Sequence, residues 1–268
     1  MTVITLTTDF GTADHEAGVL KGVIWNIAPT VKIADLSHDI PPHDILEATI
    51  LLWRAMPFFP AGTVHVVVVD PGVGTSRRGI AARLGSQYFV GPDNGLITPA
   101  LERTEQDHLP INVIQLDNRK YWLPEVNPIF HGRDVFAPSA AHLAAGIPLT
   151  SLGSPITDPV RLDIPHPTRT SQGWQAQVIH IDHFGNLSTN LLADQLGQPK
   201  NVLIRIFGAE IHGLVETFGD RPAGELVALI DSSGSLAISV VNGNAAQSIN
   251  AHMGDKIELV LVDSYVDS

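Results

Sequence analysis

The chain of 268 residues contains no cysteine and few charged side chains, and both absences narrow its possible functions. Without a thiol there are no disulfide bonds, no thiolate metal ligands and no cysteine nucleophile. Its chemistry must therefore come from Asp, Arg, His, Ser and Asn side chains. Charged residues make up 16% of the chain, against 44% hydrophobic residues. This balance excludes intrinsic disorder and allows a sizeable core, in one large domain or two smaller ones.

Basic clusters and long apolar runs are also missing. The formal net charge is -12, and no run of Lys or Arg offers a stripe for phosphate groups, so we predict no nucleic-acid partner. No segment approaches the roughly 20 apolar residues that span a bilayer. The strand-like run that starts at Val3 lacks the basic start and apolar stretch of a signal peptide. We therefore expect no membrane partner and a cytoplasmic location.

The first half of the chain alternates apolar runs with amphipathic stretches. Residues 3–7 and the β-branched run VHVVVV at 64–69 lack polar alternation, which is typical of strands covered on both faces. Between them, apolar residues spaced by three and four predict two helices, with Asp14 and Asp44 as their N-caps. We predict an N-terminal α/β domain over residues 1–160, with a largely parallel sheet flanked by helices.

The second half changes in character after a proline-rich segment. Prolines recur between Pro155 and Pro167, which favours an extended linker, and we place this linker at residues 161–170. Short β-like runs separated by Gly-containing turns follow at 177–181, 202–207, 226–230, 236–241 and 257–262. We predict a smaller C-terminal antiparallel β domain over residues 171–268, similar to a barrel.

We expect functional residues where Asp stands close to Gly after a strand, because open α/β sheets bind ligands beyond the carboxyl ends of their strands. Glycine there permits close approach of the backbone to a ligand. Asp and Gly also fill such loops for turn and capping reasons, so a single segment indicates little. Four segments have this pattern: TTDFGT at 7–12, DPGVGTSRRG at 70–79, GPDNG at 91–95 and FHGRD at 130–134.

Asp9 and a nearby His/Asp cluster are the first candidates. A carboxylate at Asp9 can accept hydrogen bonds from a ribose diol, although a plain turn residue has the same pattern. The cluster of His38, Asp39 and His43 has side chains that suit Zn or Mn, so a metal-dependent hydrolase is one alternative. Its spacing matches no metal signature, and the adjacent proline pair and the cap at Asp44 explain much of it. We therefore predict no metal and no cofactor.

A second set can activate water without a metal. Asp70 stands at the end of a buried strand, and an Arg close by, Arg77 or Arg78, would hold it ionised and favour a nearby hydroxide. His131 can orient a water molecule or relay its proton. The two arginines fit solvated loop charges equally well.

The second half offers two further segments. In IDHFGNLSTN at 181–190, Phe184 can stack on a purine and Asn186 can read an adenine edge, with Asp182 beside them. The same residues are also common in ordinary turns. In DSSGSLAISVVNGNAA at 231–246, the candidates are Ser233 and Ala245, and the Asn-Gly-Asn-Ala run can present backbone amides to a ligand or close a hairpin.

Together, in this order and spacing, these segments resemble the S-adenosylmethionine hydrolase (hydroxide adenosyltransferase) family, relatives of fluorinase and chlorinase, over essentially the whole chain. The resemblance implies hydrolysis of S-adenosyl-L-methionine at its C5′–sulfur bond, giving adenosine and L-methionine. It also implies a homotrimer in which the N-terminal domain of one subunit meets the C-terminal domain of the next at each site.

The resemblance further implies residue roles. The water-handling residues are Asp70, Arg77 and His131, with Arg78 as the neighbouring alternative. The substrate-binding residues are Asp9 for the ribose hydroxyls, Asp182 for the methionine amino group, Phe184 and Asn186 for the adenine end, and, in addition, Ser233 and Ala245.

Two positions separate this chain from the halide-using relatives. Those relatives carry Tyr where Asp70 stands, and a carboxylate repels a halide ion, so we expect hydrolysis. The fluorinase has Trp where this chain has His43, which leaves open how this end of the ligand is packed. Two alternatives stay open besides the metal-dependent hydrolase: a halide-dependent, chlorinase-like adenosyl transferase and a non-catalytic module that binds adenosine or S-adenosylmethionine.

Overall fold

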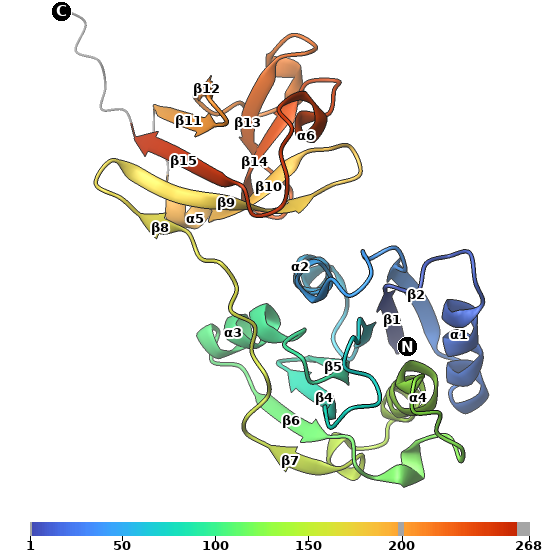
Figure 1. Ribbon diagram of the computed structural model, residues 1–268. Coiled ribbons are helices and arrows are strands. Elements are labelled where there is room, and N and C mark those ends of the chain that lie inside the picture. The colour runs from blue at the N-terminus through green and yellow to red at the C-terminus, as the bar shows by residue number, and fades with distance from the viewer. Residues whose placement is uncertain (1, 198–200, 262–268) are drawn as a thin grey trace, which may run out of the picture. The chain divides into compact units, whose positions relative to one another are not determined.

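A computed structural model describes residues 2–197 and 201–261 and divides the chain into two compact units, residues 1–163 and 164–268 (Figure 1). The first unit is α/β and the second is an antiparallel β unit, which confirms the predicted fold class. The boundary between the units falls inside the segment expected to be a linker. The last part of that segment already pairs with the second unit, through β8 (Thr168–Arg169) and β9 (Gly173–Ile181).

The N-terminal unit is built on a seven-stranded sheet with the order β2-β1-β3-β5-β4-β6-β7. The buried run predicted at 64–69 forms β3, an interior strand in which every residue is buried because helices cover both faces. The strands are β1 (Val3–Thr8), β2 (Lys32–Ser37), β3 (Val64–Val68), β4 (Gly79–Leu84), β5 (Gln87–Pro92), β6 (Ile111–Gln115) and β7 (Ser154–Ile156).

Half of this sheet is antiparallel, so it is mixed where a largely parallel sheet was expected. Strands β2, β1, β3 and β5 pair in parallel, whereas β4, β6 and β7 each pair antiparallel. The cause is the tight turn between β4 and β5, where Gly85 adopts a φ of 61° and forces the chain to reverse. As a result, β3 and β4 are consecutive in sequence but are separated in the sheet by β5.

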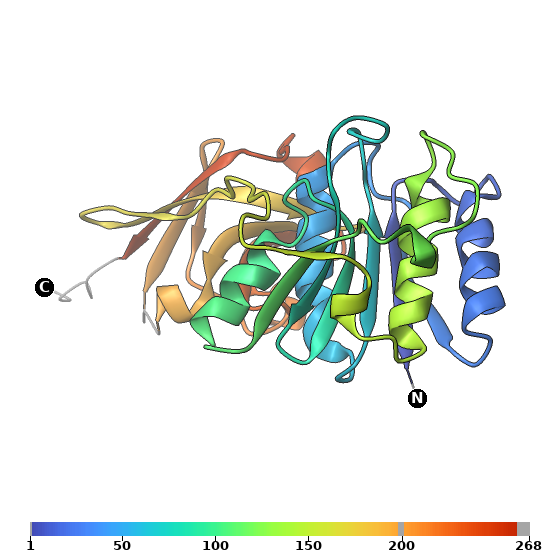
Figure 2. The same ribbon diagram turned by 90° about the horizontal axis from the view of Figure 1, so that it is seen from below.

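Two pairs of helices cover the two faces of the sheet. Helices α1 (Glu16–Ile27) and α4 (Ala137–Ala144) pack side by side on one face, and α2 (Ile45–Ala55) and α3 (Thr98–Gln106) cover the other (Figure 2). The predicted cap at Asp44 is confirmed, since its side chain accepts a hydrogen bond from the Glu47 backbone at 2.9 Å. The predicted cap at Asp14 is wrong, because α1 begins later and His15 is its N-cap residue. Among the described residues, no helix is long and apolar enough to cross a membrane.

The C-terminal unit is an antiparallel sheet that nearly closes into a barrel. Its order is β12-β11-β15-β9-β10-β14-β13. The end strands meet, because the Val215 backbone N–H after β12 donates to the Ala228 carbonyl on β13 at 2.9 Å. The other elements are β10 (Leu187–Leu192), α5 (Ala193–Leu196), β11 (Val202–Ile206), β12 (Ala209–His212), β13 (Leu226–Ile230), β14 (Ser235–Val240), α6 (Ala245–Ser248) and β15 (Lys256–Leu261). Of the expected last strand, Val262 lies outside the described residues.

Candidate active site

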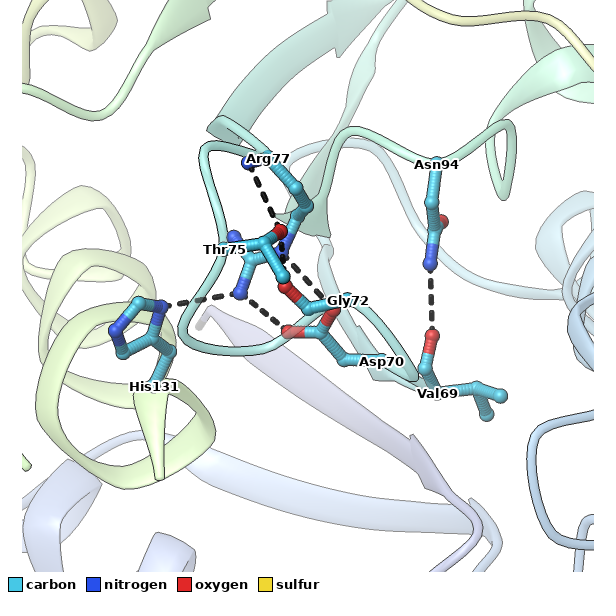
Figure 3. A network of polar contacts seen from close by, with 7 residues as sticks. All are labelled: Val69, Asp70, Gly72, Thr75, Arg77, Asn94 and His131. Atoms are coloured by element: carbon cyan, nitrogen blue, oxygen red, sulfur yellow. Dashed lines mark hydrogen bonds and ion pairs between the residues drawn. The ribbon is translucent and has the colours of Figure 1, made fainter. Parts of the chain in front are cut away.

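The loop between β3 and β4 brings Asp70 and Arg77 together in the N-terminal unit (Figure 3). The Arg77 Nε donates to Asp70 Oδ1 at 2.9 Å, and Nη2 donates to Oδ2, so the guanidinium holds both carboxylate oxygens. The side chains are only 6% and 10% exposed for Asp70 and Arg77. The Phe136 ring lies 5.3 Å from the guanidinium carbon and shields the pair on one side. Two-point pairing with little water fixes the orientation of this carboxylate closely.

His131 completes this group from a different part of the chain. It stands directly before a π-helical segment, Gly132–Phe136, and its Nδ1 lies 3.0 Å from Arg77 Nη2. A guanidinium can only donate, so Nδ1 accepts and neutral His131 carries its proton on Nε2. Burial, and then the charge of Arg77, lower the pKa of His131 below 6.5, against a smaller opposing effect of Asp70 and Asp134. At neutral pH, His131 is therefore an uncharged donor through Nε2.

Arg78 points to other partners, which distinguishes the two neighbouring arginines. Its Nε donates to Asp93 at 2.8 Å, and its Nη1 and Nη2 bind the Asp158 side chain and carbonyl. These bonds raise the pKa of the Arg78 guanidinium, first through Asp158 and then through Asp93. Of the two arginines, Arg77 is the one in contact with Asp70 and His131.

Asp9 lies at the same sheet edge and borders a cavity of about 140 Å³ that Asp70 and His131 also line. One oxygen of Asp9 accepts the backbone N–H of His43 at 2.9 Å. His43 reaches it by adopting a φ of 67°, a left-handed conformation that is uncommon for a residue with a side chain. The His43 side chain lines the cavity as well. The Asp9 carboxylate, which is suited to binding a diol, and the Asp70–Arg77–His131 group therefore lie at the same cavity.

The cluster considered as a metal site is arranged differently. His38 is 6% exposed, and its Nδ1 lies 2.9 Å from Thr8 Oγ1 while its Nε2 lies 3.2 Å from Asp35. The Asp39 backbone N–H donates to Ser37 Oγ at 3.0 Å, and His43 lines the cavity. Within residues 2–197 and 201–261, no three His, Asp or Glu side chains are grouped closely enough to hold a metal ion.

In the C-terminal unit, Asp182 organises the turn that carries Phe184 and Asn186. Its Oδ1 accepts the backbone N–H groups of Phe184 and Asn186, both at 2.9 Å, and its Oδ2 accepts from Asn186 Nδ2 at 2.7 Å. Phe184 is 71% exposed in this turn, and its ring contacts the His183 ring edge to face at 5.7 Å. An exposed aromatic ring of this kind can stack on a planar ligand. The Asn186 Oδ1 accepts no hydrogen bond from the part of the chain that the structure describes.

The second C-terminal segment is built around Asp231, whose Oδ1 accepts the Ser233 hydroxyl at 2.6 Å and the backbone N–H groups of Ser233 and Ser235. Ser233 is therefore held in place by a carboxylate. Ala245 is the first residue of α6 and is fully buried, so in this structure it presents no surface to a ligand. Asn244 caps that helix through its side chain.

Several residues around these groups lie inside the motifs but have no role that the sequence alone predicts. Phe10 and Phe130 line the cavity and contact each other edge to face, 5.8 Å apart. Asn94, in GPDNG, donates to the backbone next to Asp70. Asp231 holds its loop. Their position inside the motifs is the signal that the sequence offers. The partners of Phe10, Phe130 and Asn94 are distant in sequence, so their contacts do not follow from the motifs.

Two family models match the chain. The model described as the SAM hydroxide adenosyltransferase N-terminal domain matches residues 4–153, and the corresponding C-terminal domain matches residues 176–258. SAM denotes S-adenosylmethionine.

Individual proteins are also similar over their full length. The (R)-S-adenosyl-L-methionine hydrolase of Salinispora tropica is 38% identical and covers 96% of this chain and 97% of its own. A fluorinase from an Actinoplanes species is more distant, at 32% identity over 88% of this chain and 90% of its own. A crystal structure of an uncharacterized conserved protein from Thermotoga maritima matches with a TM-score of 0.89 and 35% identity, covering 97% of this chain and 100% of that one.

Proposed function

Because the chain belongs to the SAM hydroxide adenosyltransferase family, we propose that it hydrolyses S-adenosyl-L-methionine at the C5′–sulfur bond, giving adenosine and L-methionine. The relatives named as hydrolases are more similar to it than the fluorinases are. The observation that carries the proposal is the single guanidinium of Arg77, which binds the Asp70 carboxylate and His131 at the wall of the cavity.

The leaving group of this reaction needs no acid catalyst, whereas the nucleophile must be activated and positioned. The sulfonium leaves as a neutral thioether, so no protonation of the leaving group is needed. Water is a weak nucleophile and must attack C5′ in line with the departing sulfur. Its oxygen becomes strongly acidic as the O–C5′ bond forms, so a carboxylate is a sufficient base. Water and the sulfonium thus yield adenosine, methionine and one proton.

In this proposal Asp70, Arg77 and His131 each have a separate role in the attack by water. Asp70 accepts a hydrogen bond and then the proton from the attacking water, using a lone pair that Arg77 leaves free. Arg77 holds Asp70 and stabilises hydroxide character in the transition state. His131 donates through Nε2 and fixes the direction of the water. Holding a single water behind C5′ is worth on the order of 7 to 11 kcal/mol at best.

Substrate binding is assigned to both units. Asp9 takes the ribose hydroxyls beside the Asp70–Arg77–His131 group, and the Phe184 ring stacks on the adenine while Asn186 reads its edge. Asp182 takes the methionine amino group in addition to holding its turn, and Ser233 belongs to the same assignment, whereas the Ala245 expected with it is fully buried. The cavity of about 140 Å³ is smaller than the ~300 Å³ at which ligand pockets begin. This supports a site that is completed by other parts of the protein.

We also propose that the enzyme is a homotrimer with sites shared between subunits, uses no cofactor or metal, and works in the cytoplasm. Light scattering of the purified protein gives the number of subunits directly. Full activity after treatment with EDTA is expected, and loss of activity that a metal restores would favour the metal-dependent alternative. Fractionation of the source cells tests the location.

The decisive experiment uses S-adenosylmethionine in chloride-free buffer made with ¹⁸O-labelled water. We expect adenosine and methionine in equal amounts, with the label in the 5′-hydroxyl group of adenosine. Relatives named for the (R) form make a comparison of both sulfur epimers the natural extension. Label found elsewhere, or binding without turnover, would overturn the proposal. Formation of 5′-chloro-5′-deoxyadenosine after chloride is added would point to the halide-dependent alternative.

The matched variant is Asp70→Asn, which keeps the size of the side chain and removes the base. We expect ligand binding to persist while turnover falls to a small residual rate. Full activity of Asp70→Asn would refute the role of Asp70 as the base, and loss of binding together with turnover would make Asp70 a structural residue.

A further inference from the structure

The loop that carries Asp70 and Arg77 joins two strands that are not neighbours. It leaves β3 and enters β4, but β5 lies between these strands, and β5 runs parallel to β3. The loop must therefore cross over the carboxyl end of β5. The residues that directly follow β5, Asp93 and Asn94, consequently lie next to both ends of the loop.

Hydrogen bonds tie these two residues to the two ends. At the first end, Asn94 Nδ2 donates to the Val69 carbonyl at 2.9 Å, directly before Asp70 (Figure 3). At the second end, the Asp93 backbone N–H donates to the Arg78 carbonyl at 2.9 Å, directly after Arg77. The Asp93 carboxylate also accepts from Arg78 Nε, and its side chain is only 1% exposed.

Local stability does not explain the amide at position 94. Asn94 Oδ1 is buried and has no hydrogen-bond partner among the residues that the structure describes. A buried acceptor in this state costs about 1–3 kcal/mol, which an apolar side chain would avoid. The hydrogen bond from Asn94 Nδ2 to the Val69 carbonyl is what this side chain provides against that cost.

We propose that Asn94 is a positioning residue for the hydrolysis, which together with Asp93 clamps the ends of the 70–78 loop and so fixes Asp70 opposite Arg77. This inference rests on the proposed function, because it takes Asp70 and Arg77 as the groups that handle water. Inside the loop, Thr75 Oγ1 donates to the Gly72 carbonyl at 2.7 Å and accepts from the Arg77 backbone, which makes the crossing compact. A compact loop with both ends fixed transmits a displacement of either end to the carboxylate–guanidinium pair.

The kinetic test compares Asn94→Ala with Asn118→Ala. Asn118 Nδ2 makes the same kind of bond, to the Ser151 carbonyl at 2.8 Å, far from the site in the sequence. We expect kcat of Asn94→Ala to fall by about 100-fold, as for a misplacement of the reacting groups by about 1 Å, with KM nearly unchanged. Asn118→Ala should keep the wild-type kcat. In an Asp70→Asn background, Asn94→Ala should cause no further loss, and equal losses in both backgrounds would overturn the proposal.

A second measurement does not depend on activity. NMR titration of the His131 ring follows its pKa, which burial and Arg77 lower while Asp70 and Asp134 raise it. If the clamp positions Arg77, then Asn94→Ala should move the pKa of His131 upward, toward 6.5. Asn118→Ala should leave it in place. An unchanged titration in Asn94→Ala would overturn the clamp even if the protein proves not to be a hydrolase.

Asp93→Asn serves as the second variant if Asn94→Ala does not fold. It keeps the backbone donor to Arg78 and removes the charge that holds the Arg78 side chain. We expect the same direction of change in kcat and in the His131 titration. Wild-type values for both would contradict the role of Asp93 in the clamp.

Discussion

His65 is expected to make the N-terminal unit sensitive to acid. It lies on β3, is fully buried, and its Nδ1 is 2.7 Å from Thr5 Oγ1 on the neighbouring strand β1. Burial lowers its pKa from 6.5 to about 4, against a smaller opposing contribution from Gln87. Between these values the unfolded chain binds a proton that the folded protein does not. The free energy of unfolding must therefore fall as the pH drops below 6.5 and level off below about 4.

The size of this effect follows from the two pKa values. A difference of about 2.5 pKa units corresponds to about 3 kcal/mol once the effect is complete, and to about 2 kcal/mol at pH 5. The perturbation that removes it is the double variant Thr5→Val/His65→Leu, which replaces both partners of the buried pair by apolar side chains. The assay is denaturant unfolding at pH 7 and pH 5, followed by tryptophan fluorescence.

We expect the wild type to lose about 2 kcal/mol more than the double variant between pH 7 and pH 5. His252→Gln is the matched control, since the His252 side chain is 70% exposed, and its pH dependence should follow the wild type. If the double variant loses as much stability as the wild type, the neutral buried state of His65 is not the cause, and the reasoning from burial is refuted.

Four further outcomes are expected from the site and the fold. Arg77→Lys cannot hold both Asp70 oxygens and His131 at once, so kcat should fall by about 100-fold; a wild-type kcat would remove Arg77 from the mechanism. The wild-type rate should decline with acid at a midpoint below pH 6.5, where His131 becomes charged and stops accepting from Arg77; a midpoint above 6.5 would contradict this assignment. Phe184→Ala should raise KM by about ten-fold through lost stacking and leave kcat unchanged, whereas Phe207→Ala, exposed at another turn, should alter neither constant. Asp44→Ala should lower the free energy of unfolding by about 1 kcal/mol in denaturant titrations, and an unchanged value would show that the cap is dispensable.

The parts of the fold that the sequence predicted are those with a strong local pattern. The β-branched run at 64–69 forms the buried interior strand β3, and the cap at Asp44 has its partner only three residues away. Strands β10 and β12 were missed, because one is interrupted by polar residues and the other is very short. The reversal of β4 was missed because it depends on the turn at Gly85.

The site shows the same division between local and distant information. Asp70 was indicated by its place after a buried strand, but Arg77, which binds it, also contacts His131, a residue 54 positions further along the chain than Arg77. The residue pattern grouped Asp70, Arg77 or Arg78, and His131 as one candidate set, and the resemblance to the family favoured Arg77. Arg77 and Arg78 could not be told apart by pattern, because neighbouring residues of an extended segment point to opposite sides and only the distant partners decide their roles.

The left-handed backbone of His43 makes this position a natural place for redesign of the pocket. Asp9 is held there by a main-chain N–H, and the imidazole that lines the cavity takes no part in that bond. The wall of the cavity can therefore change in size, polarity or aromatic character while the anchor of the Asp9 carboxylate is preserved.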